Sequence, residues 1–295
     1  MYDIRHLAAA IFSCCSKQYI KGACFKPMRE DGHLARAFTA LIEKEYDDLR
    51  HIGFTKNFRR YYKDNTKKKS IVRSLYNRKY IILDDDTHGE AWFEVDKDGN
   101  CLSHKVLYCS RRKITVRFKY WYTNESSEIN TLARFDLFRF GFPVNIEIPY
   151  AWWLDKLKSD EQIEISITCV PRCLYFFESK EDCLYFNYKE SDLFLPVGAF
   201  LGCDVSSKKD AKQTNEAYIC GEVKSYNIRR NKITGLRYVH FEVQSFGFVY
   251  DLVIAEEEMS ITPDKVKYIS GNVYLYGYVY LYDFIYDVLC KDREE

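Results

Sequence analysis

From residue 81 onward, apolar and polar residues alternate in one short run after another. The runs are ITVRFKYWY, FPVNIEI, QIEISI, YVHFEV, FVYDLVI and VYLYGYVYLY. A period of two sends successive side chains to opposite faces of a β-strand, so each run predicts a half-buried strand. Phe, Trp and Tyr make up 17% of the chain, and these residues favour such pleated surfaces. The alternation therefore predicts a mainly β protein.

The beginning of the chain has a helical pattern instead. Asp31 is a candidate N-cap, apolar residues follow it at three- and four-residue spacing, and Gly53 stands where this helix should end. A shorter helix is expected between Ile4 and Phe12. Residues 1–80 are therefore predicted to be a helical N-terminal region that covers an apolar face elsewhere.

Two similar steps indicate an internal duplication. RFGFPVNIEI at 139–148 resembles SFGFVYDLVI at 245–254, and the KIT-containing stretches SRRKITVRF and IRRNKITGLRY precede them. A polar or helical connector and a further alternating run follow each copy. We therefore predict two tandem β-barrel units, residues 81–185 and 186–295, with Phe140 and Phe246 at equivalent places. A single sheet running through both regions would contradict two separate barrels.

The second unit resembles an OB-fold barrel, in which five strands carry a connector between the third and fourth. CGEVKSYNIRR resembles the first strand, and YISGNVYLYGYV is similar to the fourth and fifth strands. The G-x-V-x-x-x-G-x-V pattern there consists of Gly271, Val273, Gly277 and Val279. SH3-like barrels and small sandwiches produce similar patterns, and fold alone does not give function.

Residues 54–80 carry a concentrated positive charge. The segment holds ten Lys or Arg residues and one acid, a net charge of +9, although the whole chain is only +1. Interleaved aromatic residues make this composition typical of a phosphate-binding surface. The alternative is a solvated loop. The candidate nucleic-acid-binding cations are Lys56, Arg59, Arg60, Lys63, Lys67, Lys68, Lys69, Arg73, Arg78 and Lys79.

A row of tyrosines occupies alternate positions near the end of the chain. Tyr274, Tyr276, Tyr278, Tyr280 and Tyr282 would share one face of an uninterrupted strand. Val273, Leu275, Val279 and Leu281 would then point into the barrel. An exposed row could stack on unpaired bases, with Tyr276 and Tyr278 as candidates. Alternatively, the rings pack against the helices or the first barrel.

Catalytic and metal-binding patterns are weak. Asp204, Glu222 and Lys224 resemble a PD-(D/E)xK nuclease, in which two acids hold magnesium. However, no Pro precedes Asp204, and more alternating strand follows Lys224 instead of a helix. Zinc sites need a second pair to match Cys169 and Cys173, so neither a metal nor a cofactor is predicted.

The composition also bears on the cellular location of the protein. An odd count of 11 scattered cysteines favours reduced thiols and a cytoplasmic location. No apolar run reaches the roughly 18 residues of a membrane helix, so no membrane contact is expected. The sequence therefore predicts a non-catalytic binding protein. Single-stranded nucleic acid is the first candidate ligand, a protein partner is the alternative, and a nuclease is a remote third hypothesis.

Overall fold

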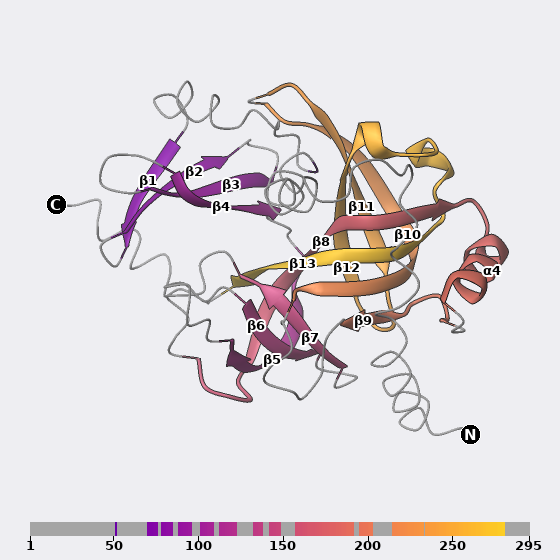
Figure 1. The fold of residues 1–295 in the computed structure, drawn as a ribbon, viewed down its shortest axis with the longest axis horizontal. Helices are drawn as coiled ribbons and strands as arrows, with labels where there is room; N and C mark the ends of the chain where they lie inside the picture. The colour runs from indigo at the N-terminus through magenta and orange to yellow at the C-terminus, as the bar shows by residue number, and fades with distance from the viewer. Residues whose placement is uncertain are drawn as a thin grey trace, which may run out of the picture.

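Strands dominate the part of the chain that the structure describes. The computed structural model describes His51 and the ranges 70–75, 78–84, 88–95, 101–108, 112–122, 132–137, 142–148, 157–191, 195–202, 214–232 and 234–280. These residues form one four-stranded and one nine-stranded sheet (Figure 1). The prediction of a mainly β protein is therefore confirmed. The two predicted N-terminal helices lie outside the described residues, apart from His51.

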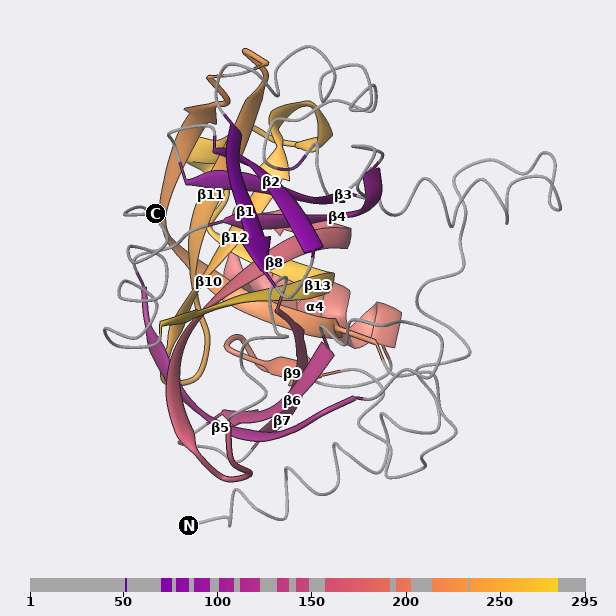
Figure 2. The same ribbon diagram turned by 90° about the vertical axis from the view of Figure 1, so that its left-hand side faces the viewer.

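The four-stranded sheet is an antiparallel meander. Its strands are β1 (Ser70–Leu75), β2 (Arg78–Asp84), β3 (Gly89–Val95) and β4 (Cys101–Tyr108). Among the described residues, strand structure thus begins at Ser70, earlier than the predicted residue 81, and it includes the end of the basic segment. Figure 2 shows this sheet lying over the region of β8 and β11.

The nine-stranded sheet contains the described part of every alternating run recognised in the sequence. Its strands are β5 (Ile114–Trp121), β6 (Leu132–Leu137), β7 (Phe142–Glu147), β8 (Gln162–Phe177), β9 (Phe200–Gly202), β10 (Glu216–Arg230), β11 (Arg237–Gln244), β12 (Val249–Ala255) and β13 (Tyr268–Tyr280). Helix α4 (Lys180–Ser191) follows β8, and the short 3-10 turns η2 (Glu256–Glu258) and η3 (Pro263–Lys265) connect β12 to β13.

The two long strands β8 and β13 form an antiparallel ribbon that belongs to two rings of paired strands. At one end, β5, β6 and β7 connect β8 to β13; at the other end, β12, β11 and β10 do so. Each ring is completed by a short parallel contact. Glu147 of β7 pairs with Tyr276 of β13, and Asp251 of β12 pairs with Thr168 of β8.

This topology does not confirm the prediction of two separate barrels. Each half of the chain supplies a three-stranded meander followed by a long strand, as the duplication requires. However, the long strand of each half also completes the ring of the other half, so one sheet runs through both regions. The predicted boundary at residue 185 therefore separates β8 from strands with which it pairs.

YISGNVYLYGYV forms one strand, β13, instead of the predicted fourth and fifth strands. Its two glycines permit close packing and do not mark a turn. Gly271 has a φ of 140°, and a Cβ there would lie 2.1 Å from the carbonyl oxygen of Cys173 on β8. A Cβ at Gly277 would lie 2.6 Å from the Ile148 side chain. The place of the fifth strand in the second ring is taken by β8.

The duplication aligns in its FGF half but not in its KIT half. Phe246 lies between β11 and β12, and Phe140, which is outside the described residues, falls between β6 and β7 in the sequence. These are the same steps of the two meanders. By contrast, Lys113 immediately precedes β5, whereas Lys232 lies in the hairpin between β10 and β11. The two KIT stretches are therefore not equivalent.

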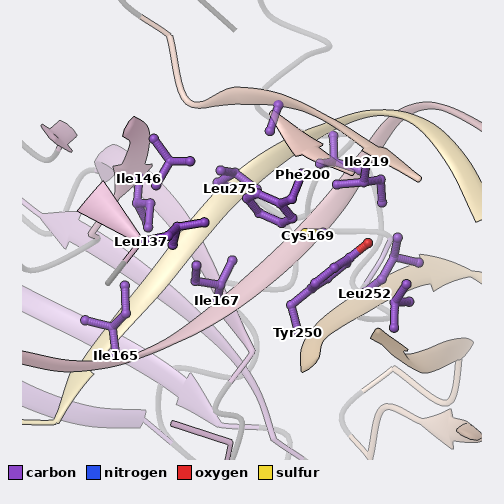
Figure 3. Packing of buried hydrophobic residues seen from close by; sticks show 14 of the residues in the cluster. Leu137, Ile146, Ile165, Ile167, Cys169, Phe200, Ile219, Tyr250, Leu252 and Leu275 are labelled. Atoms are coloured by element: carbon purple, nitrogen blue, oxygen red, sulfur yellow. The ribbon is translucent and has the colours of Figure 1, made fainter. Parts of the chain in front are cut away.

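One apolar core extends through both rings. Leu137, Ile146 and Ile165 pack toward one end of the β8–β13 ribbon, and Phe200, Tyr250 and Leu252 pack toward the other (Figure 3). Val273, Leu275 and Val279 are fully buried in this core, as the alternation of β13 predicted. No helix in the described ranges is long and apolar enough to cross a membrane.

Candidate nucleic-acid interface

The structure describes only a few of the basic residues predicted to bind nucleic acid. Lys56, Arg59, Arg60, Lys63, Lys67, Lys68 and Lys69 lie outside the described residues. Arg73 lies on β1, and Arg78 and Lys79 begin β2, so antiparallel pairing brings them together at one end of the four-stranded sheet. Tyr276 and Tyr278 lie on the other sheet. The described residues of the two predicted sites therefore belong to different sheets.

The tyrosine row is mostly packed. Tyr274 and Tyr276 are each only 7% exposed, and Tyr278 and Tyr280 are partly buried. The Lys113 ammonium lies 4.5 Å from the centre of the Tyr280 ring, so a cation already covers one ring of the row. This burial favours the packing alternative for the described part of the row. Tyr282 lies outside it.

A different surface, the hairpin between β10 and β11, carries exposed cations beside exposed apolar side chains. Backbone bonds across residues 231–236 define its tip: Asn231 N–H donates to Leu236 O, and Gly235 N–H donates to Asn231 O. The Asn231 side chain accepts a further bond from Thr234 N–H at 3.1 Å. Gly235 has a φ of 77°, a conformation that glycine adopts without strain. These bonds connect the described residues on the two sides of the tip.

Arg230 and Arg237 lie directly opposite each other at the end of this hairpin. Cross-strand partners share a face, and like charges in this position destabilise a sheet. Arg237 is ion-paired with Glu256 of η2, at 2.8 Å. Arg230 is exposed, and no carboxylate of the described residues lies within ion-pair distance of it. An anion bound between the two guanidinium groups would relieve their repulsion.

Tyr226 and Ile228 share the face of Arg230 because they lie at alternate positions of β10. Their cross-strand partners Phe241 and Val239 are buried in the core. Tyr226 and Ile228 themselves are 40% and 44% exposed. The face that forms the interior of the second ring thus continues beyond it as an open surface with one aromatic ring, one aliphatic side chain and two arginines.

Acidic groups limit the positive potential of this surface. Glu256 contacts Arg237, and Glu257 and Glu258 follow it in η2. Glu258 also lies 3.8 Å from the buried His51 ring. The negative charge of η2 therefore partly offsets the positive charge of the hairpin cations Arg229, Arg230, Lys232 and Arg237. A ligand phosphate would compete with Glu256 for Arg237.

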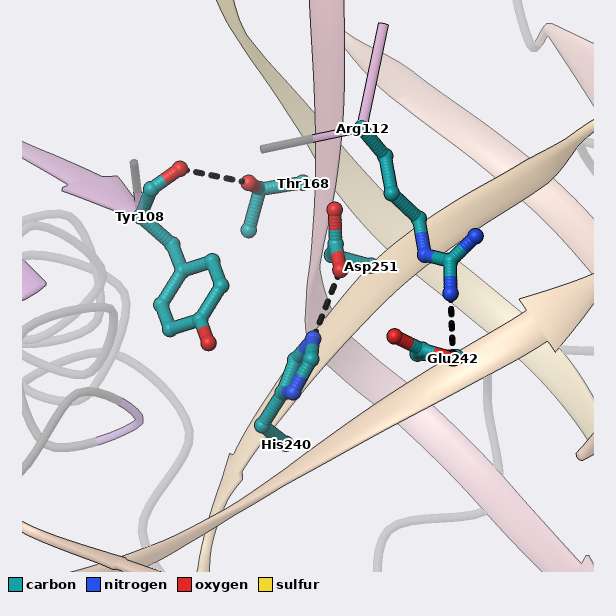
Figure 4. A network of polar contacts seen from close by, with 6 residues as sticks. All are labelled: Tyr108, Arg112, Thr168, His240, Glu242 and Asp251. Carbon is teal, nitrogen blue, oxygen red and sulfur yellow. Dashed lines mark hydrogen bonds and ion pairs between the residues drawn. The ribbon is translucent and has the colours of Figure 1, made fainter. Parts of the chain in front are cut away.

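A buried polar cluster lies where the two sheets meet (Figure 4). His240 Nε2 and Asp251 Oδ1 are 2.6 Å apart, and both side chains are almost fully buried. The Tyr108 ring, at the end of β4, stacks on the His240 ring with centroids 4.8 Å apart. Thr168 Oγ1 donates to the Tyr108 carbonyl oxygen at 3.2 Å. These contacts attach the four-stranded sheet to β8, β11 and β12.

Within the described residues, this cluster is not arranged around a nucleophile. No hydroxyl or thiol of the described residues is hydrogen-bonded to His240, whose Nδ1 has no partner. Beside the cluster, Arg112 Nη2 lies 2.5 Å from Glu242 Oε2. The Arg112 guanidinium lowers the pKa of the Glu242 carboxyl and is itself stabilised in its charged form. The residues form a structural junction between the sheets.

The nuclease-like residues form an ordinary ion pair. Lys224 Nζ lies 2.9 Å from Glu222 Oε2 on β10, and both side chains are partly exposed. Asp204 lies outside the described residues. No group of three or more His, Cys, Asp or Glu side chains in the described ranges is arranged to hold a metal ion.

The hairpin could have been noticed in the sequence. Between Glu222 and Glu242 there are five Lys or Arg residues and no acid, although this run is far less charged than residues 54–80. Its exposure could not be predicted because Tyr226 and Ile228 alternate as core residues do. No protein family, curated protein or solved structure matches this chain.

Proposed function

We propose that this protein is a non-catalytic binding protein for single-stranded nucleic acid and that the β10–β11 hairpin is part of its interface. The observation that carries the proposal is the pairing of Arg230 with Arg237 beside the exposed Tyr226 and Ile228. Arginine guanidinium groups match phosphate oxygens in a bidentate geometry. An exposed aromatic ring offers a stacking surface to an unpaired base.

The order of the paired strands supports an OB-like interpretation of both rings. In each ring a three-stranded meander is followed by a connector and a fourth strand, and a fifth strand pairs in parallel with the third. OB-fold barrels bind oligonucleotides across their second and third strands and at the loop between the first and second. In the second ring that loop is residues 231–236, the tip of the basic hairpin.

The two kinds of contact would have separate roles. Arg230 and Arg237 would bind phosphates and supply affinity without reading sequence. Tyr226 would stack on a base, worth about 1–3 kcal/mol. The cations of residues 54–80 would extend the electrostatic contact along the strand. We further propose a cytoplasmic protein whose binding requires no cofactor.

Fluorescence anisotropy with a labelled oligodeoxynucleotide of about 16 nucleotides tests this function. Binding at low salt should weaken as salt is added, and an unlabelled single strand should compete better than a duplex. Tyr226→Ala should weaken binding without changing the salt dependence. Tyr188→Ala, at an exposed tyrosine of α4, is the matched control and should bind like the wild type. Absence of binding at low salt would contradict the proposed function.

A protein partner is the second candidate. Tyr185 and Tyr188 of α4 are 59% and 62% exposed, and Tyr175 of β8 is exposed beside them, in contact with Phe186. Tyrosine is enriched in protein–protein interfaces. If no oligonucleotide binds, this tyrosine surface becomes the better supported interface.

A further inference from the structure

Two buried thiols face each other between α4 and β10. Cys183 Sγ and Cys220 Sγ are 3.7 Å apart, although the residues are 37 positions apart in the sequence. Both side chains are fully buried and both thiols are free. A disulfide requires a sulfur–sulfur separation of about 2.05 Å, so a shift of less than about 2 Å would bring the two atoms to bonding distance.

A polar network holds this pair in place. Asn187 Nδ2, one turn along α4 from Cys183, donates to Cys220 Sγ at 3.1 Å. Asn187 Oδ1 accepts hydrogen bonds from Tyr218 OH at 2.7 Å and from Ser270 Oγ at 2.6 Å. The network thus connects α4 to β10 and β13. The Asn187 bond also holds the Cys220 sulfur in position opposite Cys183.

The same network favours a thiolate at Cys220. Either thiol can donate to the other. With Cys183 as the donor, this bond, together with the bond from Asn187, lowers the pKa of Cys220 despite burial. Donating that proton and being buried raise the pKa of Cys183. One thiol is therefore prepared as the nucleophile and the other as its proton-bearing partner.

We propose that Cys183 and Cys220 are a reversible oxidation site, at which a hydroperoxide converts the two thiols to a disulfide linking α4 to β10. This site goes beyond the proposed function and does not depend on it. Transient disulfides of this kind occur in otherwise reduced compartments.

The chemistry balances with hydrogen peroxide as the oxidant. The Cys220 thiolate attacks one peroxide oxygen, the O–O bond breaks, and hydroxide leaves as Cys220 becomes a sulfenic acid. Cys183 then loses its proton and attacks the Cys220 sulfur. The S–S bond forms, the S–O bond breaks, and water leaves. Two thiols and one peroxide thus give one disulfide and two waters, and a dithiol reductant restores the thiols by exchange.

Access to the pair requires a local opening of α4. Among the α4 side chains that the structure describes, only Cys183 and Asn187 are buried, and most of the others are exposed. A helix attached by so few buried groups opens more easily than the β8–β13 ribbon. Once formed, the disulfide would suppress that opening.

Peptide mapping of the full-length protein tests the site directly. The folded protein is treated with hydrogen peroxide and the peroxide is removed. The protein is then denatured, the remaining thiols are blocked with N-ethylmaleimide, and a non-reducing digest is analysed by mass spectrometry. We expect a peptide linking Cys183 to Cys220, its disappearance after dithiothreitol, and slower amide exchange of α4 in the oxidised protein. Cys173, which is partly exposed, serves as the control thiol and should be blocked by N-ethylmaleimide.

Two variants make the assignment specific. Cys183→Ser should abolish the linked peptide and leave Cys220 as a sulfenic acid that dimedone traps. Cys173→Ser should leave the link unchanged. Labelling of Cys183 and Cys220 by N-ethylmaleimide after peroxide treatment, or linkage of either to another cysteine in preference, would overturn the proposal. The wild-type digest alone is decisive if Cys183→Ser fails to fold.

Discussion

Thr168 of β8 and Tyr276 of β13 are antiparallel partners, and each also pairs with a meander strand from the other half of the chain. Thr168 pairs in parallel with Asp251 of β12, and Tyr276 pairs in parallel with Glu147 of β7. These four residues lie in one register line across four strands. The two halves of the chain are therefore related about the middle of the β8–β13 ribbon, and neither half can complete its ring alone.

The close approach of β8 to Gly271 gives a stability prediction. Gly271→Ala should destabilise the protein by about 2–4 kcal/mol because the added methyl would collide with the Cys173 carbonyl and the φ of 140° is unfavourable for alanine. Gly235→Ala is the matched control, since Gly235 also has a positive φ but has no atom within 4 Å of the added carbon. That change should cost only about 1–2 kcal/mol. Urea unfolding measures both, and equal losses would contradict this view of the ribbon.

The junction between the sheets depends on His240. His240→Ala should lower the free energy of unfolding by about 3–5 kcal/mol because it leaves the buried Asp251 carboxylate without its partner. Asp251→Asn removes that charge, so the double variant should lose less than the sum of the two single variants. Additive losses in a urea-unfolding cycle would show that the two side chains do not interact as described.

The Arg112–Glu242 pair predicts a pH dependence. The folded-state pKa of Glu242 is lowered, so its contribution is present above the unfolded value near 4.5 and is lost as the pH falls through the folded value. Glu242→Gln should therefore cost about 0.5–1 kcal/mol at pH 7 and almost nothing at strongly acidic pH. Urea unfolding of both proteins across the acidic range measures the difference. A difference that grows on acidification would contradict the pairing.

The acidic turn next to the hairpin predicts a gain of affinity. Glu256→Gln should release Arg237 and tighten oligonucleotide binding about 2- to 5-fold. Glu257→Gln is the matched control, because it removes the same charge from the same turn. Its effect should be smaller. Anisotropy titrations at low salt compare the two, and a Glu256 variant that binds no more tightly than the Glu257 variant would contradict a role for Arg237.

Alternation predicted most strands of the nine-stranded sheet, because burial on one face leaves a local signal in each run, but it did not mark β1 to β4 or β9. The interior positions Val273 and Leu275 followed from the same pattern. The repeated FGF sequence also identified equivalent turns, because both copies lie at the local connection between the second and third strands of a meander.

Pairing between distant strands left no comparable signal. Nothing in QIEISITCVPRCLYFF indicates that β8 pairs with β12, more than 70 residues later. The glycines of β13 were interpreted as part of a pattern shared by a fourth and a fifth strand, whereas Gly271 lies in one strand and permits a close contact with β8. The hairpin surface was missed because exposure depends on where β10 and β11 extend beyond the second ring.

The salt dependence of oligonucleotide binding tests the proposed function most directly. Replacing both Arg230 and Arg237 with Gln should flatten the log-log slope by roughly 1.4, at about 0.7 per phosphate contact on a single strand. The control replaces Lys180 and Lys189 of α4 with Gln, which removes the same charge from a helix away from the hairpin tip (Figure 1). Its slope should match the wild type. Equal slopes for the arginine variant and the wild type would contradict a phosphate-binding hairpin.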